Sequence, residues 1–343
     1  MTKLLFILLV SFTVTLIAAI PFINLLYKLK FQRQREAQKD IFGYFTSIVN
    51  RLHGWKVGTP NAGGILIIVT TIILSAIFYK AVPGYEIRTK AWGINWSAVI
   101  LYLTLVCFGL IGLYDDIRKF YSFKLAGVWG LRIRYKIFLQ MVLALFIGYL
   151  LYSKIGLSSI NVPILDFDIQ LGVWYILWSA VVIFATTNAV NITDGLDGLV
   201  TGLMLFSLTT FWYLASQINV LDVALFISVI TGSLLAFLYF NIYPARVWLG
   251  DTGALSLGAI LAVIALMINS SLILPLVGFV FVLEAASSLG QMFSKGFFKK
   301  RVFIAAPLHH HFEAKGWDET KVTMRFWLAG AIASFVGLFI ALL

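Results

Sequence analysis

The segment Asn188–Gly198, which reads NAVNITDGLDG, separates two long apolar runs, Val173–Thr187 and Leu199–Ala215. Each run approaches the length that a helix needs to cross the hydrocarbon core of a bilayer. Asp194 and Asp197 are three residues apart, so both carboxylates lie on one face if the segment stays helical. Two acids beside hydrocarbon cost free energy unless a cation or a substrate compensates them. A plain polar turn is the alternative, because Asn, Asp and Gly all favour turns.

The composition of the whole chain is that of a polytopic membrane protein. Its 343 residues are 61% hydrophobic and only 12% charged, whereas soluble domains are about one quarter charged. We predict ten transmembrane helices, at residues 4–27, 62–79, 94–113, 137–153, 173–189, 199–216, 222–240, 253–269, 271–293 and 323–342. We expect a single all-α transmembrane domain over residues 1–343, in which the first apolar run is a span and not a cleaved signal.

Positive charge is distributed unevenly between the two sides that these spans define. Most of the 26 Lys and Arg residues fall in the loops after odd-numbered spans, and the positive-inside rule places those loops in the cytoplasm. Both termini then lie on the outer side. The net charge of +11 is explained by topology and by contact with anionic lipid, so we expect no nucleic-acid partner.

The segment Ser158–Gly172, on the predicted outer side, has a different period. Apolar and polar residues alternate between positions 165 and 171, which is typical of a half-buried strand. We expect a small external β-hairpin here and assign it no chemistry.

Two adjacent acids end the third predicted span, in the segment Gly112–Lys119 (GLYDDIRK). Asp115 and Asp116 oppose the helix macrodipole at this end and repel each other. Simple pairing with Arg118 and Lys119 is one interpretation. Metal binding or general-base chemistry is the functional alternative.

Two further acids occupy unusual positions. Asp251 lies between two glycines at the head of the eighth span, where it can cap the helix, bind a metal, or do both. Glu284 falls in the middle of the ninth span, and an ionisable group at that depth is a functional hypothesis by default. Pairing with Lys295 or with a neighbouring helix is the alternative for Glu284.

Basic and histidine residues supply complementary chemistry. Lys56 precedes a Gly- and Pro-rich segment whose N–H groups can bind an anion, although a plain turn back into the membrane is the favoured interpretation. Lys136 opens the fourth span and can reach a phosphate. The consecutive side chains of His309–His311 diverge, so they predict hydrogen bonding to phosphate or sugar in preference to a zinc site.

The unusual acids share one side of the predicted topology. They are Asp115, Asp116, Asp194, Asp197 and Asp251. Acids at the interface suit a reaction between a lipid head group and a soluble cytoplasmic substrate. Several carboxylates together need a cation, and Mg²⁺ with substrate phosphates is the common solution. No internal repeat is evident, which disfavours a repeat-built transporter.

Five segments together resemble the polyprenyl-phosphate N-acetylhexosamine-1-phosphate transferases, over about Lys56 to the C-terminus. They read GTPNAGG (58–64), YDDIRK (114–119), NAVNITDGLDGL (188–199), FNIYPARVWLGDTGAL (240–255) and APLHHHFEAKGW (306–317). The last block resembles the muramoyl-pentapeptide branch of the family and not its N-acetylglucosamine siblings. Asn61 stands where Thr is usual and Trp248 where Phe is usual, and neither change removes a proposed catalytic group.

The resemblance implies ten transmembrane helices, a homodimer, dependence on Mg²⁺, and a bacterial inner-membrane location with periplasmic termini and a cytoplasmic active site. Members transfer phospho-MurNAc-pentapeptide from a UDP carrier to undecaprenyl phosphate, which gives lipid I and UMP. By resemblance, Asp115, Asp116 and Asp251 are the expected catalytic and metal-binding acids, with Asp115 as a base for the lipid phosphate. The expected substrate contacts are Lys56, Lys136, Asn191, Asp194, Asp197, Trp248, Gln291, His309 and His310.

Two alternatives remain at this stage. A sibling transferase would use UDP-GlcNAc in place of the muramoyl donor. An ion-coupled transporter would need acids along a transmembrane path, where only Glu284 qualifies.

Overall fold

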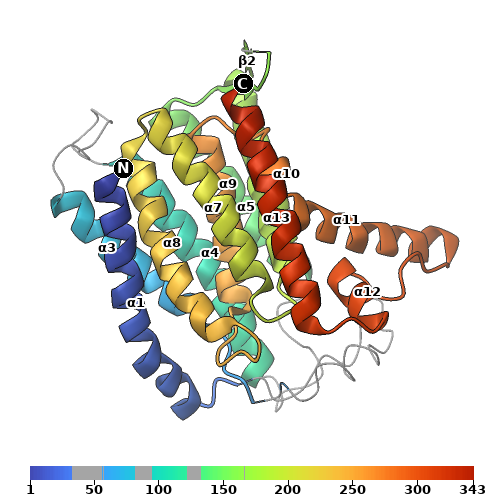
Figure 1. Cartoon of the computed structure of the whole chain (residues 1–343). Coiled ribbons are helices and arrows are strands. Elements are labelled where there is room, and N and C mark those ends of the chain that lie inside the picture. The colour runs from blue at the N-terminus through green and yellow to red at the C-terminus, as the bar shows by residue number, and fades with distance from the viewer. Residues whose placement is uncertain (33–55, 57, 82–94, 122–132, 166) are drawn as a thin grey trace.

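The chain is mostly helical in the computed structural model, which describes residues 1–32, 56, 58–81, 95–121, 133–165 and 167–343 (Figure 1). The long helices are α1 (Thr2–Lys28), α3 (Gly64–Ala81), α4 (Trp96–Tyr121), α5 (Ile133–Leu150), α6 (Tyr175–Thr193), α7 (Leu199–Gln217), α8 (Leu221–Asn241), α9 (Gly250–Met267) and α13 (Glu319–Leu342). The shorter helices are α10 (Leu274–Val277), α11 (Phe279–Phe293) and α12 (Leu308–Ala314). Single π or 3-10 turns occupy η3 (Leu151–Ile155), η4 (Gly172–Trp174) and η5 (Ser294–Phe298).

Within the described part of the chain, nine helices are long and apolar enough to cross a membrane. The predicted span 271–293 is not among them, because the helix is interrupted at Gly278 between α10 and α11. Pro275 lies in the first turn of α10. Backbone N–H groups there have no acceptor within the helix, so the lack of an N–H in proline costs no hydrogen bond. Helix α11 then points sideways out of the bundle (Figure 1). A tenth continuous span is therefore not confirmed.

Helix α9 is the centre of the bundle. It contacts α3, α4, α6 and α7, and nearly all of its residues are buried. Beyond Asp251 its sequence carries no charge, which suits burial on every face. Small residues let the neighbours approach closely: a Cβ at Gly64 would overlap Gly253, and a Cβ at Gly258 would lie 2.8 Å from the Cα of Thr187.

The predicted hairpin is present. Strands β1 (Ser159–Val162) and β2 (Phe167–Gln170) pair antiparallel, with Ser159 opposite Gln170. The expectation of a half-buried strand is wrong, because all four residues of β2 are exposed. The hairpin projects from one end of the bundle, where no helix covers its outer strand (Figure 1). Only Ile160, on β1, is buried within these two strands.

Both chain termini lie at the same end of the bundle as the hairpin, and α12 lies towards the other end (Figure 1). The predicted connections between the first four spans fall largely outside the described residues.

Candidate active site

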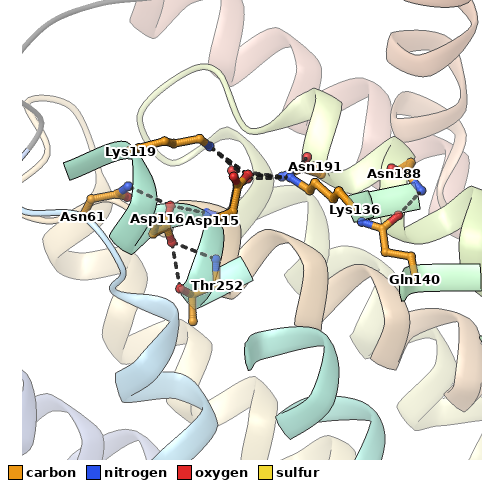
Figure 2. Close-up of polar contacts among 10 residues, drawn as sticks. Asn61, Asp115, Asp116, Lys119, Lys136, Gln140, Asn188, Asn191 and Thr252 are labelled. Carbon is orange, nitrogen blue, oxygen red and sulfur yellow. Dashed lines mark hydrogen bonds and ion pairs between the residues drawn. The ribbon is translucent and has the colours of Figure 1, made fainter. Parts of the chain in front are cut away.

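The C-terminal end of α4 meets the N-terminal end of α9. A Cβ at Gly112 would overlap the backbone carbonyl oxygen of Asp251, so glycine is what lets the two backbones come this close. Asp115 and Asp116 follow in the next turn of α4 and therefore reach the first turn of α9. The polar contacts that result are drawn in Figure 2.

Asp116 caps α9 from the neighbouring helix. Its Oδ2 accepts the backbone N–H and the hydroxyl of Thr252, at 3.0 and 2.8 Å. Its Oδ1 accepts the backbone N–H of Asp251 and the side-chain amide of Asn61, both at 3.2 Å. The first N–H groups of a helix need such acceptors, and a negative charge is favourable there. Asp116 thus performs the capping that the sequence had suggested for Asp251.

Two lysines and two aspartates form what we call the aspartate–lysine cluster: Asp115, Lys119, Lys136 and Asp251. Lys136 Nζ lies 2.6 Å from Asp251 Oδ2 and 3.1 Å from Asp115 Oδ2. Lys119 Nζ lies 2.9 Å from the same Asp251 oxygen and 3.4 Å from Asp115 Oδ2. Figure 2 shows the two ammonium groups approaching the carboxylates from opposite sides. Each charged group of the cluster therefore lies against a group of opposite sign.

The polar end of α6 completes this cluster. Asn191 donates from its amide to Asp251 Oδ1 at 3.3 Å, and its oxygen lies 3.5 Å from Lys136 Nζ. Asp194 follows the last residue of α6 and has no hydrogen-bond partner among the described residues. Burial raises the pKa of Asp194 to about 8, and the nearby charges of Asp251 and Asp116 add to the shift. The pattern is that of a carboxyl poised to accept a cation or a donor group.

Asp197 belongs to a second cluster. Its Oδ1 accepts from Lys56 Nζ at 2.7 Å and from the indole N–H of Trp248 at 3.1 Å. Its Oδ2 accepts the backbone N–H of Ala245 at 3.0 Å. Lys56 also pairs with Glu319, at the start of α13. Two predicted substrate contacts, Lys56 and Trp248, therefore meet at one carboxylate.

Asp194 and Asp197 do not share one helical face, because the segment between them does not stay helical. Helix α6 ends at Thr193, and α7 begins only after Gly198, which adopts a left-handed φ of 74°. The five residues between the two helices form a non-helical loop, and the two carboxylates point to different clusters. Asp194 lies near Asp251, and Asp197 binds Lys56.

Three predicted substrate contacts, Gln291, His309 and His310, lie on α11 and α12. Gln291 holds the loop that follows α11, because its oxygen accepts the N–H groups of Val302 and Phe303 at 3.0 Å and its amide donates to Phe303 O at 2.9 Å. His309 is buried, and its Nε2 faces Gly195, where any Cβ would overlap it. This contact brings the histidine run against the loop that carries Asp194. His310 Nδ1 lies 2.8 Å from Glu313 Oε2.

Comparison with known proteins shows the family of this chain. Residues 98–269, which run from α4 through α9, match the model of glycosyl transferase family 4. The chain is 39% identical to the phospho-N-acetylmuramoyl-pentapeptide-transferase of Caldanaerobacter subterraneus subsp. tengcongensis, over 98% of each chain. It is 36% identical to the protein of that name from Clostridium perfringens, over 95% of this chain and 93% of the relative. The match to a Listeria monocytogenes protein of the same name is 33%, over 95% and 94%.

The chain belongs to the phospho-N-acetylmuramoyl-pentapeptide transferase family. The family-model match contains Asp115, Asp116, Lys119, Asn191 and Asp251. The first four are labelled among the polar contacts of Figure 2.

The donors in this transferase-family site are compatible with Mg²⁺. No three His, Cys, Asp or Glu side chains in the described ranges form a ready-made metal site. Mg²⁺ does not require one, because one or two carboxylates with water and substrate phosphates usually suffice. Asp115 and Asp251 supply two carboxylates, and two ammonium groups already converge on Asp251 Oδ2. Both oxygens of Asp116 are engaged in capping α9, so its role as a metal ligand stays a prediction.

Sequence reasoning missed two residues of this transferase-family site. The sequence predicts Lys119 only as a charge partner of the adjacent acids, yet it pairs most closely with Asp251 on another helix. Its spacing of four residues from Asp115 on α4 was the available signal. Glu319 accepts the N–H of Asp197 at 2.8 Å and pairs with Lys56. No sequence pattern connects Glu319 to a residue 122 positions away.

Proposed function

We propose that this chain transfers phospho-MurNAc-pentapeptide from its UDP-linked form to undecaprenyl phosphate, releasing UMP and forming lipid I. The observation that carries the proposal is the aspartate–lysine cluster, two carboxylates and two ammonium groups at the end of the most buried helix. The names of the relatives point to the same transfer. Phosphoryl transfer depends mainly on positioning and charge neutralisation, which such a cluster supplies.

The two lysines have the geometry to hold phosphate groups. Lys119 and Lys136 lie on different helices and converge on one point, so a phosphate entering there would be gripped from two sides. Asp115 and Asp251 would hold Mg²⁺, which when bound neutralises the diphosphate and stabilises departing UMP. Asp115 is also the proposed acceptor of the proton from the lipid phosphate. One phosphoanhydride replaces another, so the reaction needs no external energy source.

The remaining polar residues would each contact a different part of the donor substrate. Asn191 and Asp194 adjoin the aspartate–lysine cluster and would face the nucleotide and metal. Asp197 and Trp248 would hold the uridine, with Lys56 exchanging its partner Asp197 for a phosphate oxygen. Three further contacts are proposed for the sugar side: Gln291, His309 and His310.

We further propose the finer features that the family resemblance implies. The chain forms a homodimer in the bacterial inner membrane, as one transmembrane catalytic domain with ten spans. Both termini and the β1–β2 hairpin face the periplasm, and the aspartate–lysine cluster faces the cytoplasm, where the soluble nucleotide substrate is found. The excess of Lys and Arg in the corresponding loops supports this orientation.

Neither alternative is favoured. The relatives reported above carry the muramoyl-pentapeptide name, which does not support a UDP-GlcNAc donor. The acids gather at helix ends and not along a path through the bundle, which does not support an ion-coupled transporter.

The test is an assay of the purified full chain in detergent with radiolabelled UDP-MurNAc-pentapeptide and undecaprenyl phosphate. We expect labelled lipid and UMP in equal amounts, and we expect both to require Mg²⁺. UDP-GlcNAc in the same assay should give no product. Transfer from UDP-GlcNAc but not from UDP-MurNAc-pentapeptide would overturn the proposal. Release of no UMP from either donor would overturn it too.

A further inference from the structure

Glu284 is a fully buried carboxylate on α11. Both of its oxygens face His309. Oε1 accepts the backbone N–H of His309 at 3.1 Å, and Oε2 lies 2.9 Å from the ring atom Nδ1. Because an ionised carboxylate only accepts hydrogen bonds, this contact places the ring proton on Nδ1.

The other ring nitrogen of His309 faces the active-site loop. Nε2 is buried and has no hydrogen-bond partner among the described residues. It lies against Gly195, which sits next to Asp194 in the loop between α6 and α7. With the proton on Nδ1, Nε2 presents a lone pair at this place. A buried nitrogen without a partner costs free energy, so its retention beside the loop points to a ligand that donates to it.

The two following histidines are held by other elements. His310 Nδ1 contacts the carboxylate of Glu313 at 2.8 Å, on the same short helix. His311 Nδ1 accepts the backbone N–H of Ile304 at 3.2 Å, which places the proton of the neutral ring on Nε2. The partner of each Nδ1 therefore decides the proton position: a carboxylate places it on Nδ1 in His309 and His310, and a backbone N–H places it on Nε2 in His311.

We propose that Glu284 is a positioning residue that fixes His309 in the Nδ1–H tautomer, so that Nε2 accepts a hydrogen bond from an N–H or O–H group of the bound nucleotide–sugar. The identity of that ligand rests on the proposed function. The tautomer itself rests only on the two contacts between Glu284 and His309.

Glu284→Gln reverses the tautomer with almost no change in shape. The carboxamide oxygen retains the backbone N–H of His309, and the NH₂ group then donates to Nδ1. The ring proton moves to Nε2, which becomes a donor where the ligand needs an acceptor. The opposite amide orientation is disfavoured, because it sets the NH₂ group against the backbone N–H. We expect kcat/KM for the UDP donor to fall about 10- to 100-fold, by analogy with residues that orient metal-binding histidines.

The direct measurement is nitrogen-15 NMR of the histidine-labelled full chain in lipid nanodiscs. His309→Gln identifies the signals of that ring by their loss. We expect wild-type His309 protonated on Nδ1 and the Glu284→Gln ring protonated on Nε2. His311 supplies the opposite tautomer as an internal reference. Glu313→Gln is the matched control, since it makes the same chemical change beside His310 and should leave the signals of His309 in place.

Two results would overturn the proposal. One is a wild-type His309 ring protonated on Nε2, a result that needs no variant to fold. The other is a Glu284→Gln protein with the switched tautomer, an unchanged melting temperature and wild-type kcat/KM. A wild-type protein with the expected tautomer but no transfer activity would refute the proposed function instead, and with it the ligand assigned to Nε2.

Discussion

Asp251 receives more polar contacts than a residue that only caps a helix would need. Its Oδ2 accepts from both lysines of the aspartate–lysine cluster, and its Oδ1 accepts from Asn191. Its backbone N–H is satisfied separately by Asp116. The side chain of Asp251 is therefore not needed for capping and lies in the aspartate–lysine cluster.

Replacing Asp251 with asparagine should abolish Mg²⁺-dependent turnover while leaving the fold intact. Asparagine keeps the shape but not the charge that balances two ammonium groups, so we expect a loss of at least about 100-fold in kcat. UMP release measures the effect, and circular dichroism checks the fold. Asp168→Asn, on the exposed hairpin, is the control and should keep full activity. Near-normal turnover of the Asp251 variant would contradict the proposed role of Asp251 in metal binding.

The raised pKa of Asp194 predicts a pH dependence of stability. A carboxyl in the unfolded chain ionises near pH 4, whereas that of Asp194 ionises at about 8 because of burial and the nearby acids. Between about pH 4 and 8 the folded state therefore binds more protons than the unfolded state, and the contribution of Asp194 to stability falls as pH rises.

Asp194→Asn should flatten this part of the profile. The measurement is thermal unfolding of both proteins in detergent with EDTA, from pH 5 to 9. The wild-type protein should lose stability relative to the variant as pH approaches 8. Parallel profiles across the range would show that Asp194 ionises normally.

At the scale of elements, the site depends on two helix ends brought together. The C-terminal end of α4 carries two acids against its own dipole, and the N-terminal end of α9 offers unsatisfied N–H groups. Asp116 accepts the backbone N–H and the hydroxyl of Thr252. This contact satisfies an N–H group of α9 and places the negative charge of Asp116 at a helix N-terminus, where it is favourable. The pairing needs close backbones, which Gly112 provides.

Gly112→Ala should therefore disturb catalysis more than the small size of the added methyl group suggests. The new Cβ meets the backbone of Asp251, which cannot rotate away, so the helices must separate. We expect a loss of about 1–3 kcal/mol in unfolding free energy and roughly 100-fold in kcat, because misplacement by about 1 Å costs that much. Gly290→Ala in α11 is the matched control, since a Cβ there meets nothing within 4 Å. Equal behaviour of the two variants would exclude the close-contact explanation.

At the scale of the whole molecule, the hairpin and both termini share one end, and α12 with the histidine run lies towards the other (Figure 1). The proposed orientation puts the first end in the periplasm. The Lys and Arg distribution is the basis for that choice.

Cysteine labelling tests the orientation. The single native cysteine is replaced first, as Cys107→Ala, and either Asp168→Cys or Lys315→Cys is then added. In intact protoplasts a membrane-impermeant maleimide should label the Asp168→Cys protein and not the Lys315→Cys protein. Permeabilisation should make both reactive. The reverse pattern would invert the topology.

Most of the spans and the hairpin were predictable from the sequence, because hydrophobicity and turn preference are local properties of the chain. The interruption at Gly278 was not, since Pro275 near a helix start is equally compatible with a continuous span. The exposure of β2 was not predictable either, because alternation shows which residues can be buried and not whether another element covers them.

The site divides in the same way. The sequence by itself determined which carboxylates, lysines and histidines are unusual for a membrane protein. Only the tertiary structure decided their partners: Asp116 on the head of α9, Lys119 on Asp251, Lys56 between Asp197 and Glu319, and Glu284 on His309. The physical reason is that a side chain's partner depends on which helix faces pack together, and long-range packing leaves no periodic signal along the chain.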